Sequence, residues 1–169
     1  IWYEKMMATD RNPFTRILGF RQIGLVHKSW GRFTKSLEAY RRAEAVADSA
    51  KITPQTSWVE QSVGSLFFDA DRFDDAIAHY HRAAALDSLN PGAVISEARV
   101  QALAGNKEKA LELTRRLGEK WAGRVDSTVM QTGGKEIAAN VAVAAGDYQR
   151  AIENYLAARK ISGDTTGYR

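Results

Sequence analysis

One helical pattern occurs four times along this chain, and that repetition restricts the possible folds more than any other feature. The clearest copy lies within residues 69–87, DADRFDDAIAHYHRAAALD. Its larger apolar and small side chains follow one another at intervals of three and four, which places them on one side of an α-helix: Phe73, Ala76, Ile77, Tyr80, Ala83 and Ala84. Related stretches occupy residues 31–46, 105–120 and 146–160. A helix repeated in this way predicts an array of stacked units that bury one another's apolar faces.

Each copy combines a tight turn with a fixed set of positions on the helix that follows. The triplets on that helix are Ser36/Tyr40/Ala43, Ala76/Tyr80/Ala83, Ala110/Thr114/Leu117 and Ala151/Tyr155/Ala158. The turn before it contains Gly31, Asp71, Gly105 or Gly146, and the preceding segment contributes a small residue at Gly24, Gly64, Ala98 or Ala139. Measured between the first residues of the triplets, successive copies are 40, 34 and 41 residues apart.

These features resemble the tetratricopeptide (TPR) repeat, whose period is about 34 residues, and the resemblance covers residues 12–162. The third unit lacks both aromatics, and the family's first-helix tryptophan is replaced by Phe20, Glu60, Val94 and Lys135. The resemblance implies an all-α fold. Specifically, it implies a right-handed α-solenoid of antiparallel helix pairs, a TPR-like superhelix whose concave face is lined by the first helices.

Prolines mark the expected starts of three first helices. Asn12-Pro13, Thr53-Pro54 and Asn90-Pro91 each place a potential N-cap residue before a proline at the first helical position. The expected first helices are 13–29, 54–69, 91–104 and a fourth from 127 or 133 to 145, because Gly133-Gly134 leaves its start open. The expected second helices are 32–49, 72–87, 107–122 and 147–161. No segment alternates at period two for long enough to predict a strand.

We expect one TPR-like domain at residues 12–162, with units at 13–49, 54–89, 91–123 and 127–161. Residues 1–11 bring Ile1, Trp2, Met6 and Met7 close together along the chain. They are interpreted either as an N-terminal helix or as the end of a preceding repeat. Residues 163–169 are expected to be a C-terminal tail, truncated within a longer protein.

Nothing in the sequence indicates catalysis, a cofactor or a metal ion. Cysteine is absent, so no thiolate site is possible. His79 and His81 are two residues apart on one helix and point in different directions, whereas shared ligation needs a spacing of three or four. His27 falls at a packing position, and Gly133-Gly134-Lys135 lacks the remaining residues of a phosphate-binding loop. No apolar run approaches the roughly 20 residues that span a bilayer. We therefore expect a chain that is not an enzyme.

The charge pattern argues against direct binding of nucleic acid. The formal net charge is +4, from 24 basic and 20 acidic side chains. Basic pairs such as Arg41-Arg42 and Arg115-Arg116 lie on expected second helices rather than along one stripe, and no recognised nucleic-acid motif accompanies them. Nucleic acid is an unlikely partner on these grounds. The compartment does not follow from the sequence, although the cytoplasm is slightly favoured.

The resemblance instead implies a protein or peptide partner, bound along a groove that the first helices line. Carried over position by position, the groove residues are Leu18, Arg21, Leu25, Lys28, Trp58, Gln61, Ser65, Phe68, Ile95, Arg99, Ala102, Glu136, Asn140 and Val143. Trp58 and Phe68 are interpreted either as apolar anchors for the partner or as packing residues. Arg21, Lys28 and Arg99 are expected to select an acidic or polar group of the partner.

Two further expectations concern the class of function. Of the positions that grip a carboxylate in chaperone-binding TPR domains, only Arg21 has a suitable side chain, so that clamp is not expected here. The alternative to a partner-binding module is a structural spacer, or a dimerisation or regulatory domain of a larger signalling protein or enzyme. Homo-oligomers are compatible with either interpretation.

Overall fold

The structure is a computed structural model that describes residues 12–87, 90–121 and 127–163. The interpretation of residues 1–11 lies outside the described residues, and so does the expected tail after residue 163. Every regular element in the described ranges is an α-helix. The eight helices within them are α2 (Pro13–Ser29), α3 (Phe33–Ser49), α4 (Thr53–Phe68), α5 (Phe73–Leu86), α6 (Pro91–Leu103), α7 (Lys107–Trp121), α8 (Ser127–Ala144) and α9 (Tyr148–Ser162).

The all-α prediction is confirmed, and the observed helices begin and end close to the predicted positions. The fourth first helix begins at Ser127, so the earlier of its two expected starts is the right one. Gly133 and Gly134 lie inside this helix. Among the described helices, none combines the length and the apolar character needed to cross a bilayer.

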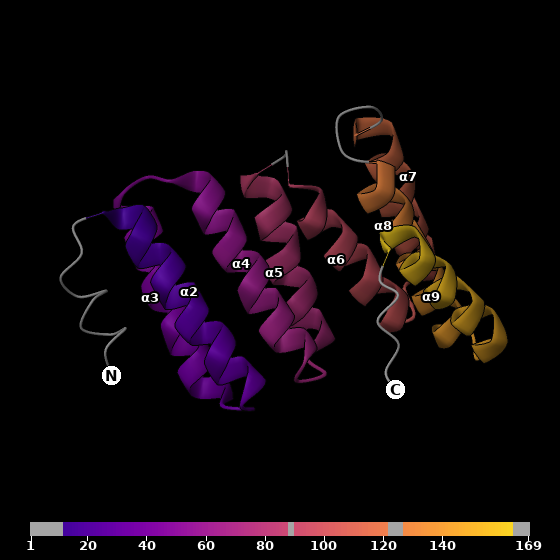
Figure 1. The fold of residues 1–169 in the computed structure, drawn as a ribbon, viewed down its shortest axis with the longest axis horizontal. Helices are drawn as coiled ribbons and strands as arrows, with labels where there is room; N and C mark the ends of the chain where they lie inside the picture. Colours follow the sequence, from indigo (N-terminus) through magenta and orange to yellow (C-terminus); the bar gives the residue numbers. More distant parts are fainter. Residues whose placement is uncertain (1–11, 88–89, 122–126, 164–169) are drawn as a thin grey trace. The chain divides into compact units, whose positions relative to one another are not determined.

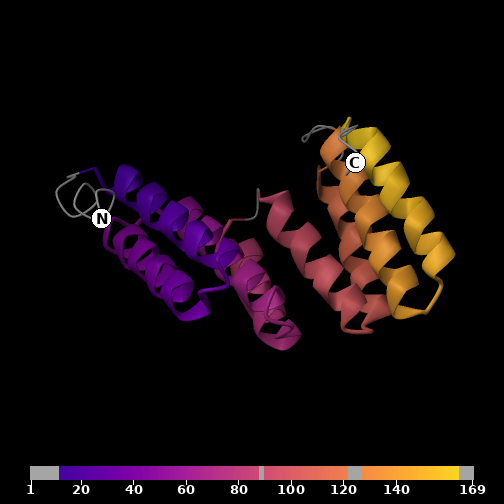
Figure 2. The ribbon, with the colours of Figure 1, turned by 60° about the horizontal axis from the view of Figure 1, so that its bottom comes forward.

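The chain divides into two compact units, residues 1–90 and residues 91–169. The first unit contains the pairs α2/α3 and α4/α5, and the second contains α6/α7 and α8/α9. Within each pair the helices lie side by side and run in opposite directions (Figures 1 and 2). In the first unit α4 packs against both α3 and α2, and in the second unit α8 packs against both α6 and α7.

One type of turn joins the two helices of every pair. Gly31, Asp71, Gly105 and Gly146 all have positive φ angles, between 56° and 85°. The next residue donates its backbone N–H to a carbonyl five residues earlier, as Arg32 does to His27 and Arg72 does to Phe67. This is the Schellman arrangement, in which a left-handed residue lets the chain satisfy the last free carbonyls of a helix. The predicted turn positions are therefore confirmed.

In both helix pairs of the first unit, the central contact is that of a tyrosine ring with a glycine of the paired helix. The rings of Tyr40 and Tyr80 are buried and lie against Gly24 and Gly64, so a side chain at either glycine would collide with them. The backbone is tied at the same level, because Ser36 Oγ donates to the carbonyl of Gly24 at 2.8 Å. Small residues here allow the paired helices to approach closely, as the sequence pattern predicts.

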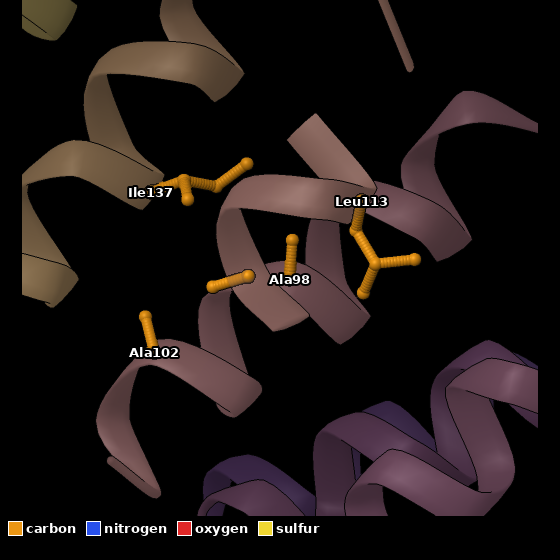
Figure 3. Close-up of a cluster of buried hydrophobic side chains, with 5 residues drawn as sticks. Ala98, Ala102, Leu113 and Ile137 are labelled. Carbon is orange, nitrogen blue, oxygen red and sulfur yellow. The ribbon is translucent and has the colours of Figure 1, made fainter. Parts of the chain in front are cut away.

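The core of the second unit depends on alanine, leucine and isoleucine instead. Ala98 and Ala102 of α6, Leu113 of α7 and Ile137 of α8 meet in one buried cluster (Figure 3), together with Ala110. In a second buried cluster Ile95 packs with Leu117, and Ile95 lies so close to α8 that a Cβ at Gly133 would be 2.9 Å from Ile95 Cδ1. Gly133, which together with Gly134 made the start of α8 uncertain in the sequence, therefore has a packing role.

The cap predictions hold in part. Asn12 caps α2, since its side-chain oxygen accepts from the backbone N–H of Phe14 at 2.9 Å. The assignment of Thr53 as a cap is wrong, because Thr53 is already helical and Ile52 occupies the cap position without a side-chain bond. Asn90 precedes α6 as expected, and its amide nitrogen donates to Ser57 and Gln61 of α4.

Candidate functional site

The predicted groove residues of the first unit lie on adjoining faces of α2 and α4, which we call the α2–α4 face. Leu18, Arg21, Leu25 and Lys28 are spaced by three and four on α2, as are Trp58, Gln61, Ser65 and Phe68 on α4. This spacing brings each set to one side of its helix. Because α2 and α4 are in contact, the two sets form one surface.

Arg21 and Trp58 form the centre of the α2–α4 face. The guanidinium carbon of Arg21 lies 5.6 Å from the centroid of the Trp58 ring, within the range of a cation–π contact. Arg21 Nε also donates to Ser62 Oγ at 3.4 Å. Burial lowers the pKa of Arg21, and the nearby Tyr40 hydroxyl opposes that shift. The side chain of Trp58 retains 37% of its exposure, so the indole is supported from one side and open to solvent on the other.

Lys28 occupies the far end of the face and is bound on both sides. Its ammonium nitrogen donates to Ser65 Oγ at 2.7 Å and pairs with an Asp69 carboxylate oxygen at 3.0 Å. A pocket of about 400 Å³ opens beside this pair, with Phe33 and Leu66 among its lining residues. The charge of Lys28 is thus already compensated within the unit.

The remaining residues of the face divide into exposed and packed groups. Leu25 is exposed and Leu18 is half-buried. Phe68 is also half-buried and stacks on Phe73 of α5, with ring centroids 6.0 Å apart. Gln61 accepts a hydrogen bond from Asn90 at 3.2 Å. Of the two aromatic candidates, therefore, Trp58 is the one that is well exposed.

In the second unit the predicted residues are more deeply involved in packing. Arg99 of α6 pairs with Glu136 of α8 at 3.3 Å, and both are half-buried. Ile95 and Ala102 are buried in the core, and Val143 is half-buried. Asn140 is also buried and accepts a hydrogen bond from the Tyr155 hydroxyl. The interpretation of Ile95, Ala102 and Asn140 as residues that a partner touches does not fit this burial, because neighbouring helices already cover them.

A buried polar cluster lies between α3, α4 and α5, and the sequence did not predict it. Glu60 is only 5% exposed. One of its oxygens lies 2.6 Å from His79 Nδ1 and the other lies 3.4 Å from Arg82 Nε. Glu44 of α3 approaches the same carboxyl: burial raises the pKa of Glu44, and the charges of Glu60 and Asp48 raise it further. Arg82 stays 56% exposed while its guanidinium reaches the buried carboxyl of Glu60.

The position of Glu60 was the available signal for this cluster. The TPR repeat that the sequence resembles has a tryptophan at this position, so an acid there requires polar partners from the neighbouring helices. Periodicity alone does not reveal which side chains supply them.

In the ranges that the structure covers, no group of three or more histidine, cysteine, aspartate or glutamate side chains is arranged to hold a metal ion.

Comparison with solved structures identifies the architecture. The chain is similar to BtubC (BKLC) from P. vanneervenii, with a TM-score of 0.69 and 16% identity over 99% of this chain and 73% of that one. It is also similar to a putative kinesin light chain from Podosopora anserina with nearly identical TPR-like repeats, with a TM-score of 0.65 and 16% identity over 97% and 85% of the two chains. The chain has the tetratricopeptide-repeat fold.

A third TPR-fold similarity is to MamA, with a TM-score of 0.60 and 18% identity over 98% of this chain and 88% of MamA. No protein-family model matches the chain, and no curated protein matches it at a significant level. At these identities the likeness concerns the fold. In TPR terms α2, α4, α6 and α8 are the first helices of four helix-pair repeats in an α-solenoid, and α3, α5, α7 and α9 are the second helices.

Proposed function

We propose that this TPR-fold chain is a protein-interaction module without catalytic activity, and that it binds a peptide or protein segment along the α2–α4 face. The observation that carries the proposal is the exposed indole of Trp58 at the centre of a surface held in place by side-chain contacts between two helices. Arg21 and Lys28 of α2 both contact α4. A surface ordered in this way loses little side-chain entropy when a partner binds.

Trp58 and Leu25 supply the apolar part of the face. Tryptophan is enriched among the interface residues that contribute most to binding, and a buried anchor of this kind contributes about 2 kcal/mol or more. Trp58 is in contact with the guanidinium of Arg21, and Leu25 lies exposed on the neighbouring helix. An apolar side chain of the partner would cover both.

Arg21 is the cation that remains for an acidic group of the partner. Lys28 is paired with Asp69 and Arg99 with Glu136, so their charges are largely compensated. Within the described residues, no carboxylate pairs with Arg21, whose polar contact is the Ser62 hydroxyl. A carboxylate brought in by the partner would offset the cost of holding this guanidinium half-buried beside Trp58. We therefore expect a bound segment to place an acidic side chain next to an apolar one.

The proposal is tested by selecting peptides from a random displayed library on the whole chain and measuring the affinity of the best one for two variants. Trp58→Ala removes the proposed anchor and should weaken binding at least about tenfold, which corresponds to about 1.4 kcal/mol. Trp30→Ala is the matched control, because Trp30 is a more exposed tryptophan of the same unit, at 61%, that lies outside the face. Equal losses in the two variants, or a loss only with Trp30→Ala, would contradict the proposal.

A further inference from the structure

A pocket of about 400 Å³ lies at the junction of the two helix pairs of the first unit. Lys28 and Ser29, from the last turn of α2, contribute to its lining, and so do Asp69 and Ala70, which follow α4. We call it the Asp69 pocket. Because α2 and α4 pack against each other, this pocket is built from two neighbouring repeats within one unit.

The ion pair in the Asp69 pocket exposes its acid and covers its base. The Lys28 side chain is 17% exposed, whereas the Asp69 side chain is 51% exposed. The Lys28 ammonium also donates to Ser65 Oγ at 2.7 Å. Within the described residues, this ammonium is the group that pairs with Asp69, and it does so through one of the two carboxylate oxygens. A ligand that enters the pocket therefore meets a carboxylate that can accept further hydrogen bonds.

The other polar groups of the lining also favour a ligand that donates hydrogen bonds. The hydroxyl of Ser29 donates its proton to a backbone carbonyl of α2 at 2.9 Å, which leaves the oxygen as an acceptor. The backbone N–H groups of Gly31 and Ala70 already donate to carbonyls of the helices that precede them. The ends of α2 and α4 border the pocket with roughly half a negative charge each, and the start of α3 borders it with a similar positive charge. The lining thus suits a cation better than an anion.

Phe33 and Leu66 supply the apolar part of the pocket. The Phe33 ring is half-buried and meets Phe67 edge to face at 5.4 Å. An arginine of the same unit already uses such surroundings. The guanidinium carbon of Arg72 lies 4.6 Å from the centroid of the Phe67 ring, and one of its nitrogens pairs with Asp75 at 2.7 Å. Because a guanidinium is planar and carries several N–H donors, it combines an aromatic contact with a carboxylate contact better than an ammonium does.

We infer that the Asp69 pocket binds an arginine side chain of a partner protein, with the guanidinium on Asp69 and over Phe33 and the aliphatic part against the apolar lining. The identification of this partner with the segment that covers Trp58 rests on the proposed function. Arg21 and Lys28 are seven residues apart, which is about 10 Å along α2. A bound segment would therefore carry its acidic group and its arginine about 10 Å apart.

The test titrates the isotope-labelled whole chain with a capped arginine, N-acetyl-arginine methylamide, and follows the backbone amide signals by NMR. The signals of Gly31 and Ala70, which line the pocket, should shift and saturate. The corresponding capped citrulline has a similar shape without the charge and should give no saturable shift. Asp69→Asn should weaken binding of the capped arginine about three- to tenfold, because a charge-assisted hydrogen bond is lost.

Asp71→Asn is the matched control. It removes the same charge two residues further along, from an exposed residue that does not line the pocket. Asparagine tolerates the left-handed backbone of Asp71, whose φ angle is 56°. The control should change the affinity by less than about twofold, and circular dichroism should show both variants to be folded. The inference is overturned if the capped arginine gives no saturable shift, if citrulline binds as well, if the two variants behave alike, or if a capped glutamate binds there instead.

A second set of measurements separates this inference from the proposed function. Trp58→Ala should leave the affinity for the capped arginine unchanged, because Trp58 does not line the pocket. Selected peptides that depend on Trp58 should contain an arginine, and replacing it with citrulline should weaken binding to the original chain but not to Asp69→Asn. Peptides that depend on Trp58 and ignore Asp69 would overturn the inference and leave the proposed function standing. A capped arginine that binds while no selected peptide depends on Trp58 would contradict the proposed function and support the pocket.

Discussion

The ring of Tyr80 on α5 lies directly against the backbone of Gly64 on α4, where an added Cβ would be 2.9 Å from Tyr80 Cδ1. Tyr40 and Gly24 have the same relationship in the preceding pair. Real Cβ atoms do not come this close to an aromatic carbon. The contact therefore sets the distance between the two helices of each pair.

Gly64→Ala should destabilise the chain by about 1–3 kcal/mol, because the methyl group forces the Tyr80 ring or the helices apart. Alanine by itself favours a helix more than glycine does, so a loss of stability in Gly64→Ala can come only from the crowding against Tyr80. Gly118→Ala is the control, since Gly118 is exposed within α7 and nothing lies near its potential Cβ. This substitution should stabilise by up to about 1 kcal/mol. Urea unfolding followed by circular dichroism measures both; a stabilising Gly64→Ala would show that the contact is loose.

Tyr80→Ala should destabilise by about 3–5 kcal/mol, as is usual when a buried aromatic is removed from a core. Tyr80 is buried between the two helices of its pair. Arg41→Ala, at an exposed position of α3, should change stability by less than about 0.5 kcal/mol. The comparison uses the urea midpoints of unfolding of the two variants, provided that both show the same slope of unfolding free energy against urea concentration. Two equally mild effects would contradict the assignment of inner and outer faces.

Glu44 should make stability depend on pH in a direction opposite to that of a salt-bridged acid. Its pKa is raised by burial and by the neighbouring carboxylates of Glu60 and Asp48, so the folded chain holds the proton more tightly than the unfolded chain. The stabilisation from that proton is complete below the ordinary glutamate pKa of 4.5 and is lost as the pH rises through the higher folded pKa.

Glu44→Gln should therefore remove this part of the pH dependence and stabilise the chain at neutral pH. Urea midpoints measured across the acidic range compare it with Glu38→Gln, which removes an exposed acid from the same helix. His79 and Arg82, which also face Glu60, are unchanged in both variants. If the two variants show the same pH profile as the original chain, Glu44 is not coupled to Glu60.

The sequence predicted the helices well because their signals are local. Prolines mark the starts of α2, α4 and α6, and the four turn residues have the positive φ angles expected of them. Spacing along a helix also determines which side chains share a side, so the sequence indicates which residues of α2 and of α4 lie together.

What the sequence could not provide is the partner of each side chain across helices. Lys28 was predicted as a cation for the partner, but Asp69, the residue that follows α4, compensates it. Ile95 and Asn140 were predicted to be accessible, but α8 and α9 cover them. Ser62, which binds Arg21, lies one turn beyond Trp58 and was not among the predicted groove residues. Such contacts depend on the angle and register between helices, which periodicity does not determine.

The most direct measurement of the central proposal is fluorine NMR of the chain labelled with fluorotryptophan, with and without a peptide selected for binding. The sequence contains four tryptophans, and single tryptophan-to-phenylalanine variants assign their signals. Binding along the α2–α4 face predicts that the Trp58 signal shifts in proportion to the bound fraction, while the Trp30 signal stays in place. A bound peptide that leaves the Trp58 signal unchanged, or that shifts only Trp30, would contradict the proposed site.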